Sequence, residues 1–173
     1  ALDVSVAAAH ILVESSLSEQ PTAIVGQDSR ASGEFLEAAV VAGLTSAGIN
    51  VYRVGVLPTP AIAHLVAEMK CDLGVMISAS HNPMPDNGIK LFARGGGKLD
   101  DAIEARIEAR MGEAWERPTG RNVGRVINAD SATEKYVQHL LSSVETPLKG
   151  LKIVVDCANG ASSIVAPEVY RRA

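Results

Sequence analysis

Residues 77–90 (ISASHNPMPDNGIK) carry the side chains best suited to chemistry in this sequence. The hydroxyl of Ser80 is followed by the imidazole of His81, and the ammonium of Lys90 comes shortly after. A hydroxyl in such surroundings could accept a phosphoryl group, because cations stabilise the transferring charge and positioning does most of the remaining work. The same residue types equally fit a surface turn chosen for backbone reasons. Residue types alone leave both interpretations open.

The residues around Ser80 predict a stiff loop at the end of a strand. Pro83 and Pro85 fix two φ angles and favour extended geometry in the residue before each. Asn87 and Gly88 predict a tight turn that brings Lys90 back alongside the loop. Because ligands bind at the carboxyl ends of strands in open α/β sheets, we expect Ser80 on an exposed loop, with Lys90 pointing into the same cleft.

A serine-hydrolase interpretation has less support. The sequence has no Gly-x-Ser-x-Gly motif, and we expect the adjacent side chains of Ser80 and His81 not to face each other.

The elements that must position these residues alternate between strand-like and helix-like patterns. Apolar runs or alternation predict strands over residues 22–28, 50–56, 73–78, 88–93, 123–127 and 151–156, and helical spacing predicts helices over residues 1–16, 34–47, 60–69, 101–111, 130–144 and 161–172. Thr59 and Asp100 are the expected N-caps of two helices, and Gly48 is the expected C′ residue of another. This alternation predicts an α/β layered fold with a mixed, mainly parallel sheet flanked by helices.

Residues 146–150 (TPLKG) are typical of a linker. One strand and one helix follow it, which cannot bury a core by themselves. We therefore expect a domain over residues 1–147 that lacks its N-terminal strand, and the start of a second, similar domain over residues 148–173.

Composition excludes several classes of function. The 173 residues include 16 basic and 20 acidic side chains, a formal net charge of −4, which argues against nucleic-acid and membrane-surface partners. Aromatic residues make up only 3%, too few for a base-stacking platform. No apolar run is long enough to cross a membrane, and no secretory leader opens the chain. Cys71 and Cys157 are too few and too far apart for a disulfide framework or a zinc cluster, so we expect each to be a small buried thiol in a protein of a reducing compartment, the cytoplasm.

Residues 78–83 (SASHNP) and 86–90 (DNGIK) resemble the phosphoserine loop of the α-D-phosphohexomutases, and within that superfamily they are most similar to the bacterial phosphoglucosamine mutases. Three further segments match in order: residues 27–33 (QDSRASG), 55–60 (GVLPTP) and 155–160 (VDCANG). Gln27 departs from the arginine usual at that place. The resemblance covers essentially the whole chain, and it implies a phosphohexomutase first domain.

The resemblance implies that Ser80 carries the phosphate passed to the sugar and regained from it, interconverting glucosamine 6-phosphate and glucosamine 1-phosphate through a 1,6-bisphosphate, a step in cell-wall precursor synthesis. It implies Mg²⁺ bound through the Ser80 phosphate. Lys90 would supply a point charge or a proton, or be only a solvated strand-edge lysine. His81 would handle a proton or contact phosphate, or only cap the turn. Arg30 is expected to brace the loop or to pair with Asp28, without a catalytic role.

The chain also lacks parts of the superfamily pattern. It has no Asp-x-Asp-x-Asp metal loop, no Gly-Thr-x-Gly-x-Arg segment and no sugar-recognition loop, so the remaining metal ligands are expected outside it and we expect no turnover by this chain alone. Two alternatives stay open: a phosphomannomutase/phosphoglucomutase, and a non-catalytic module that binds a phosphosugar or a partner chain. The sequence also leaves a homodimer open.

Overall fold

A five-stranded sheet forms the centre of the protein in the computed structural model, which describes residues 1–13, 18 and 20–173. Its strands are β1 (Thr22–Gln27), β2 (Asn50–Val56), β3 (Leu73–Ile77), β4 (Ile89–Ala93) and β5 (Val126–Asn128), in the order β4-β3-β1-β2-β5. The pairs β1–β2, β1–β3 and β2–β5 are parallel, and β3–β4 is antiparallel. The predicted mixed, mainly parallel sheet is confirmed.

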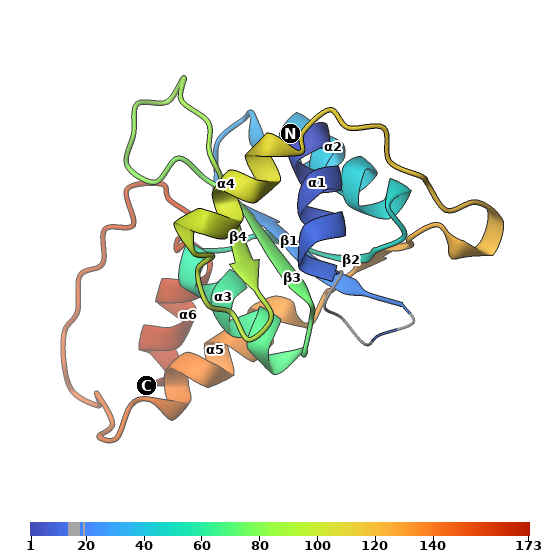
Figure 1. Cartoon of the computed structure of the whole chain (residues 1–173). Helices are drawn as coiled ribbons and strands as arrows, with labels where there is room; N and C mark the ends of the chain where they lie inside the picture. The colour runs from blue at the N-terminus through green and yellow to red at the C-terminus, as the bar shows by residue number, and fades with distance from the viewer. Residues whose placement is uncertain (14–17, 19) are drawn as a thin grey trace.

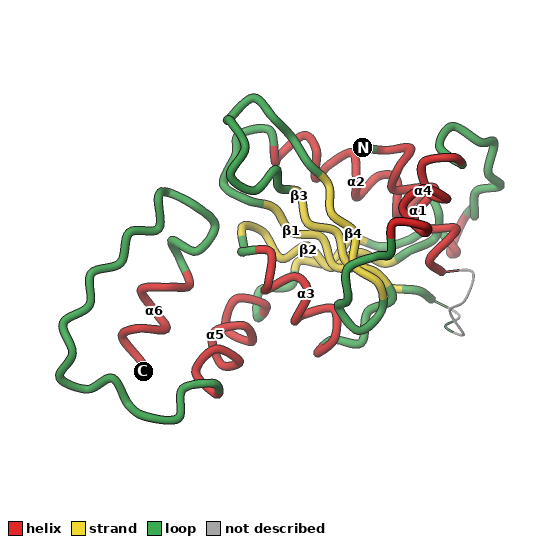
Figure 2. Tube along the Cα trace, turned by 60° about the vertical axis from the view of Figure 1, so that its left-hand side comes forward, coloured by secondary structure: helices red, strands yellow, loops and turns green. Residues whose placement is uncertain are grey.

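Helices cover both faces of this sheet, giving three layers (Figures 1 and 2). One face packs against α1 (Leu2–Val13), α2 (Gly33–Ser46) and α4 (Asp101–Ala109). The other is covered by α3 (Thr59–Glu68) and α5 (Ala132–Ser142), and α6 (Val165–Arg172) packs on α5 at the outside. A short 3₁₀ turn, Gly120–Asn122, precedes β5. No helix of the described residues is long and apolar enough to cross a membrane.

The central strand β1 connects the two apolar cores. Ala23 and Val25 belong to the core under α1 and α2, whereas Ile24 belongs to the core under α3 and α5. All three are completely buried, because successive side chains of a strand point to opposite faces and both faces are covered. Cys71 is buried as well, and that burial raises the pKa of its thiol. The expectation of a buried thiol is therefore confirmed for Cys71 and is wrong for Cys157, which is only partly buried on the segment leading into α6.

Two predicted helix ends can be compared directly. Gly48 has a φ of +90° directly after the C-terminal cap of α2, which confirms its predicted C′ position. The prediction of Thr59 as an N-cap is wrong by one residue. Pro58, with an extended ψ of 152°, takes that place and the helix begins at Thr59. A proline in the first turn removes only an N–H that has no intrahelical partner there, so Pro60 is accommodated without cost.

Other predicted boundaries shift by a few residues. The helix expected over residues 130–144 is confined to Ala132–Ser142, and the strand expected over 123–127 is displaced to Val126–Asn128. The helix after Asp100 ends at Ala109, so Met111 lies beyond it and is largely exposed. Asp100 is the N-cap residue, but its side chain makes no capping hydrogen bond. Residues 14–16, expected to continue the first helix, lie outside the described residues.

The strand predicted over residues 151–156 is wrong. Within the described part of the chain this segment pairs with no strand and runs as a loop (Figure 2). A strand needs a neighbour to satisfy its backbone groups and no described strand lies beside this segment, and Val154 is 99% exposed because nothing packs on it. After it, α6 starts only at Val165, which is buried against the core of α3 and α5. The division at residue 147 stays a prediction.

Candidate functional site

A pocket of about 480 Å³ lies at the carboxyl ends of β1 and β3. Ser80 and His81 of the loop after β3 form one wall. The turn after β1, residues 28–30, and the start of α3 form its floor, and the opposite wall is Ala158 with residues 160–162. The pocket is where an α/β sheet is expected to bind ligands.

Ser80 is exposed and has a φ of +57°, in the left-handed region. Its N–H donates to Ser78 Oγ at 3.0 Å, and the N–H of Ser78 donates to the carbonyl of Gly88 at 2.9 Å. A non-glycine residue in this region costs about 1–2 kcal/mol and persists only where the surroundings hold it. The exposure and position of Ser80 agree with the prediction, and its role in chemistry stays a prediction.

His81 lies closer to Ser80 than the sequence suggested. Its Nδ1 is 3.3 Å from Ser80 Oγ, so the expectation that the adjacent side chains do not face each other is wrong. The physical reason is the left-handed backbone of Ser80. In an extended strand the side chains of two successive residues point to opposite sides, and the positive φ of Ser80 removes that alternation. No carboxylate among the described residues bonds His81, and Asp86 instead accepts from Asn82 Nδ2 at 3.2 Å. A Ser-His-Asp triad is therefore not formed here.

Arg30 connects the turn after β1 to the Ser80 loop. Its Nε donates to Asp28 Oδ2 at 3.2 Å and its backbone N–H to Asp28 Oδ1 at 3.1 Å. Its two terminal nitrogens donate to five loop carbonyls: Ser80 (3.1 Å), Asn82 (2.8 Å), Pro83 (2.8 Å), Met84 (3.4 Å) and Asp86 (2.7 Å). Both predicted contacts of Arg30, with the loop and with Asp28, are confirmed.

Lys90 lies on β4, directly opposite Met76 of β3. Opposite residues of an antiparallel pair point to the same face, and Met76 lines the pocket, so Lys90 is on the pocket's face of the sheet. Its side chain is exposed and does not line the pocket. Gly88 allows the close return of β4, since a Cβ there would lie 2.6 Å from the carbonyl oxygen of Ser78. The role of Lys90 in the cleft stays a prediction.

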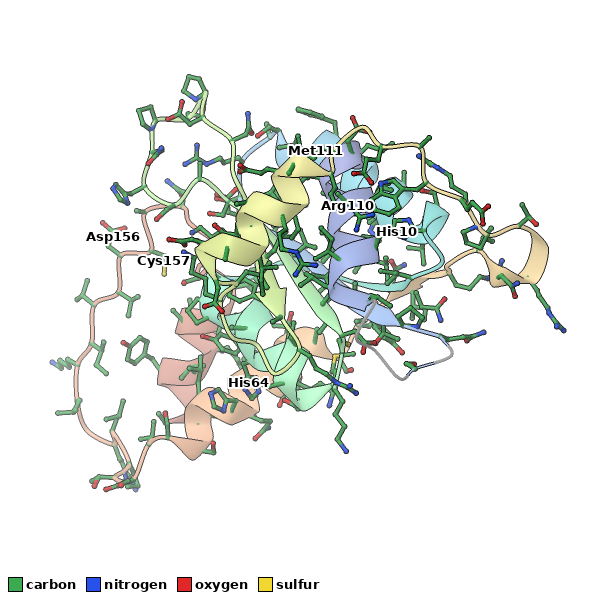
Figure 3. All side chains as sticks on the ribbon, viewed as in Figure 1. His10, His64, Arg110, Met111, Asp156 and Cys157 are labelled. Carbon is green, nitrogen blue, oxygen red and sulfur yellow. The ribbon has the colours of Figure 1, made fainter. Side chains whose placement is uncertain are left out.

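The sequence did not predict that residues 158–162 lie at the pocket. Residues 155–160 were only matched to a segment of the superfamily. Ser29 Oγ donates to the carbonyl of Asn159 at 2.8 Å and joins this wall to the turn after β1. Ala158 and Asn159 both have positive φ, and Figure 3 shows Asp156 and Cys157 on the segment leading into the turn. The Asn-Gly pair at 159–160 signals a turn, but not what the turn contacts.

The residues at the pocket do not make a divalent-metal site by themselves. Among the described residues, no group of three or more His, Cys, Asp or Glu side chains could hold a metal ion. The nearest carboxylate on the pocket floor, Asp28, is engaged by Arg30. Hard cations need several oxygen ligands, so a site on Ser80 requires ligands that the described residues do not supply.

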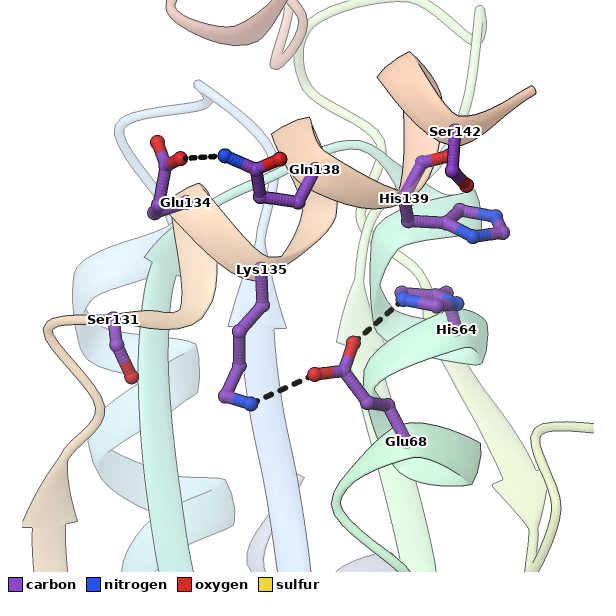
Figure 4. Close-up of a pocket in the computed structure, with 8 residues that line it drawn as sticks. All are labelled: His64, Glu68, Ser131, Glu134, Lys135, Gln138, His139 and Ser142. Atoms are coloured by element: carbon purple, nitrogen blue, oxygen red, sulfur yellow. Dashed lines mark hydrogen bonds and ion pairs between the residues drawn. The ribbon is translucent and has the colours of Figure 1, made fainter.

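A second hollow, of about 460 Å³, lies between α3 and α5 (Figure 4). Glu68 accepts from Lys135 Nζ at 2.7 Å and pairs with His64 Nε2 at 2.8 Å. The Lys135 hydrogen bond is the largest influence that lowers the pKa of Glu68, and His64 adds to it against the opposing effect of burial. The rings of His64 and His139 stack at 3.7 Å. These groups satisfy one another, which indicates a structural contact between two helices.

Sequence comparison identifies this fold, with an exposed serine at the end of a strand, as a phosphosugar-mutase domain. The family described as phosphoglucomutase/phosphomannomutase, alpha/beta/alpha domain I, matches residues 1–117, and the chain belongs to this family.

The names of individual relatives specify a narrower activity than the family description does. The chain is 64% identical to the phosphoglucosamine mutase of Salinispora arenicola over 177 residues, covering 100% of this chain and 39% of that protein. It is 60% identical to the phosphoglucosamine mutase of Acidothermus cellulolyticus over 175 residues, covering 100% of this chain and 38% of the relative. The chain therefore spans well under half of the relatives it matches.

Solved structures show the same fold. A phosphoglucomutase/phosphomannomutase family protein of Burkholderia thailandensis superposes with a TM-score of 0.72 at 27% identity, over 98% of this chain and 37% of that one. A putative phosphomannomutase of Thermus thermophilus superposes with a TM-score of 0.67 at 24% identity, over 83% and 31% of the two chains, and supports the fold alone.

Proposed function

We propose that this chain is the phosphoryl-carrying portion of a phosphoglucosamine mutase, an isomerase that interconverts glucosamine 6-phosphate and glucosamine 1-phosphate. The observation that carries the proposal is Ser80. Its hydroxyl is exposed at the carboxyl end of a strand, beside an imidazole, on a loop held from below by a guanidinium. The identity of 64% to a phosphoglucosamine mutase supports this choice of substrate.

The reaction is a pair of phosphoryl transfers. The phosphorus–oxygen bond of phosphorylated Ser80 breaks while the sugar 1-hydroxyl oxygen bonds to phosphorus and releases its proton to water, which gives the 1,6-bisphosphate and the free Ser80 hydroxyl. The phosphorus–oxygen bond at the sugar 6-position then breaks while Ser80 Oγ bonds to that phosphorus, and the sugar 6-oxygen takes up a proton from water, which leaves glucosamine 1-phosphate. His81 Nδ1, at 3.3 Å from Ser80 Oγ, is placed to give a proton to that oxygen as it leaves and to take it back when it attacks.

Positive charge at this site comes in part from the chain itself and in part from a metal ion in our proposal. Lys90 lies on the pocket's face of β4 without lining the pocket, and we propose that its positive charge acts on the transferring group, because preorganised charge is a main source of catalysis in phosphoryl transfer. Mg²⁺, bound by the Ser80 phosphate and by ligands outside the described residues, would neutralise phosphoryl oxygens. The two free cysteines fit a reducing compartment such as the cytoplasm.

The decisive experiment uses the complete gene product that carries this chain. Intact-mass and peptide mass spectrometry should find one phosphate, on Ser80. Ser80→Ala should lower turnover of glucosamine phosphates by on the order of 10⁴-fold or more, because it removes the covalent step. Ser142→Ala, whose hydroxyl donates to the carbonyl of His139 at the end of α5, is the matched control and should retain full activity. Turnover that survives in Ser80→Ala would refute the proposal.

A phosphomannomutase/phosphoglucomutase is the second candidate, because the matching family is described by those two activities. The two candidates share the serine loop and differ in the sugar they accept. Comparing kcat/KM on glucosamine, glucose and mannose phosphates separates them, and a preference for mannose or glucose phosphate would decide for the second.

A further inference from the structure

We propose that Arg30 is the positioning residue that holds Ser80 for phosphoryl transfer, an inference that rests on the function proposed above. The Arg30 side chain is only 14% exposed and lies beneath the loop. Its guanidinium reaches carbonyls spread over residues 80–86, at distances of 2.7–3.4 Å. Arg30 touches none of the reacting atoms and acts through the loop backbone.

The loop has little else to hold it. Every residue from 80 to 87 is exposed, and Met84 is 81% exposed, so apolar burial contributes little to its order. Within the loop the backbone bonds from Asn82 to Ala79 and from Asp86 to Pro83 close two local turns but do not attach them to the sheet. Arg30 does attach them, through hydrogen bonds of the charge-assisted kind, which are roughly twice as strong as neutral ones.

Only a guanidinium can make this set of bonds. It has five N–H donors in one plane, and Asp28 takes the Nε donor and so sets the orientation of the plane. The four remaining donors face the five carbonyls. A lysine ammonium at this place would be a compact charge with three donors, too small to span residues 80–86.

The arrangement acts directly on the backbone of Ser80. The N–H of Ser80 is held by Ser78 Oγ, and its carbonyl is held by Arg30 Nη2 at 3.1 Å. The peptide groups on both sides of Ser80 are therefore fixed, which maintains a φ of +57° that the residue would otherwise leave. Relaxation to negative φ would turn Oγ away from its present direction and from His81 Nδ1.

The same turn also sets the distance to the opposite wall. Ser29, directly before Arg30, bonds the carbonyl of Asn159 at 2.8 Å. The turn that carries Arg30 therefore contacts the Ser80 loop through Arg30 and the opposite wall through Ser29, and in-line transfer between a serine and a bound sugar requires such fixed relative positions.

The test uses the complete gene product with Arg30→Lys, Arg30→Gly and a control, Arg53→Lys. Arg53 pairs with the buried Glu37, and its side chain makes no hydrogen bond to the loop, so its variant exchanges a guanidinium for an ammonium in an ion pair elsewhere. We expect kcat of the Arg30 variants to fall on the order of 10²-fold, as a misplacement of about 1 Å can cause, with KM for the sugar phosphate within about threefold of wild type. Millimolar guanidinium should restore part of the kcat of Arg30→Gly and have no such effect on Arg53→Lys.

Hydrogen exchange by mass spectrometry supplies a readout independent of activity. In Arg30→Lys the backbone amides of residues 79–88 should exchange faster than in wild type, and those of β1 and β3 should exchange at the wild-type rate. Unchanged exchange in the loop, an equal fall of kcat in Arg53→Lys, or a rise in KM with intact kcat would each overturn the proposal. A wild-type protein without phosphate on Ser80 would instead refute the proposed function, while the exchange result still decides whether Arg30 holds the loop.

Discussion

Gly88 offers a sharp test of how closely the two strands beside the site must approach. A Cβ at this position would lie 2.6 Å from the carbonyl oxygen of Ser78, where ordinary contact begins near 3.4 Å, and 3.2 Å from Ala79 Cα. Gly88→Ala therefore requires the start of β4 and the end of β3 to separate by about 0.8 Å, the difference between the first two distances. Both neighbours are backbone atoms, so no side-chain rotation can relieve the overlap.

Two costs follow from that separation. Overpacking of this kind costs about 1–3 kcal/mol. The bond from the Ser78 N–H to the Gly88 carbonyl, 2.9 Å long, would weaken as well, at a cost of up to about 1 kcal/mol. For a chain of this size each kcal/mol lowers Tm by about 2–4 °C. Because Ser80 follows Ser78 closely in the loop, turnover should also fall by up to about 10²-fold.

Gly97→Ala is the matched control. A Cβ at Gly97 meets no heavy atom within 4 Å, and its φ is not positive, so the variant should match wild type within about 0.5 kcal/mol. Urea unfolding of both variants measures the stability difference, and kcat of the complete gene product measures the effect on the site. Equal stability and equal kcat in Gly88→Ala and Gly97→Ala would refute the reasoning about the Ser78–Gly88 contact.

Two further outcomes concern charge. Arg53→Ala should lower the free energy of unfolding by about 1–3 kcal/mol, since it leaves the carboxylate of Glu37, only 3% exposed, without its partner; urea titration that finds no loss would contradict this. Glu68 has a folded pKa below its ordinary value, mainly through Lys135, so its contribution to stability is full above about pH 4.3 and disappears as pH falls through the lower folded value. Glu68→Gln should remove that part of the fall in the free energy of unfolding at acid pH. An unchanged slope of the free energy of unfolding against pH between about pH 3 and 5 would show that Glu68 does not contribute.

Much of the architecture follows from local sequence patterns. The apolar run of β1 predicts a strand buried on both faces, and Ala23, Ile24 and Val25 are completely buried. Gly48 marks the end of α2 because its left-handed backbone is unfavourable for other residues. The position of Ser80 just beyond a buried strand was likewise predictable, since both the apolar run and the polar residues after it are contiguous in the chain.

Contacts between distant residues were decided by the tertiary structure. The segment 151–156 has the apolar pattern of a strand, yet it forms none because no described strand lies beside it to accept its hydrogen bonds. The turn at residues 158–162 lines the same pocket as Ser80 through the packing of α6 on α5 and the hydrogen bond from Ser29 to Asn159, and no local pattern encodes either contact. Ser80 has its left-handed backbone, with His81 close by, where Arg30, 50 residues earlier in the chain, donates a hydrogen bond to its carbonyl. The sequence determined which residues are available for chemistry, and the long-range hydrogen bonds of the folded chain determined which way they point.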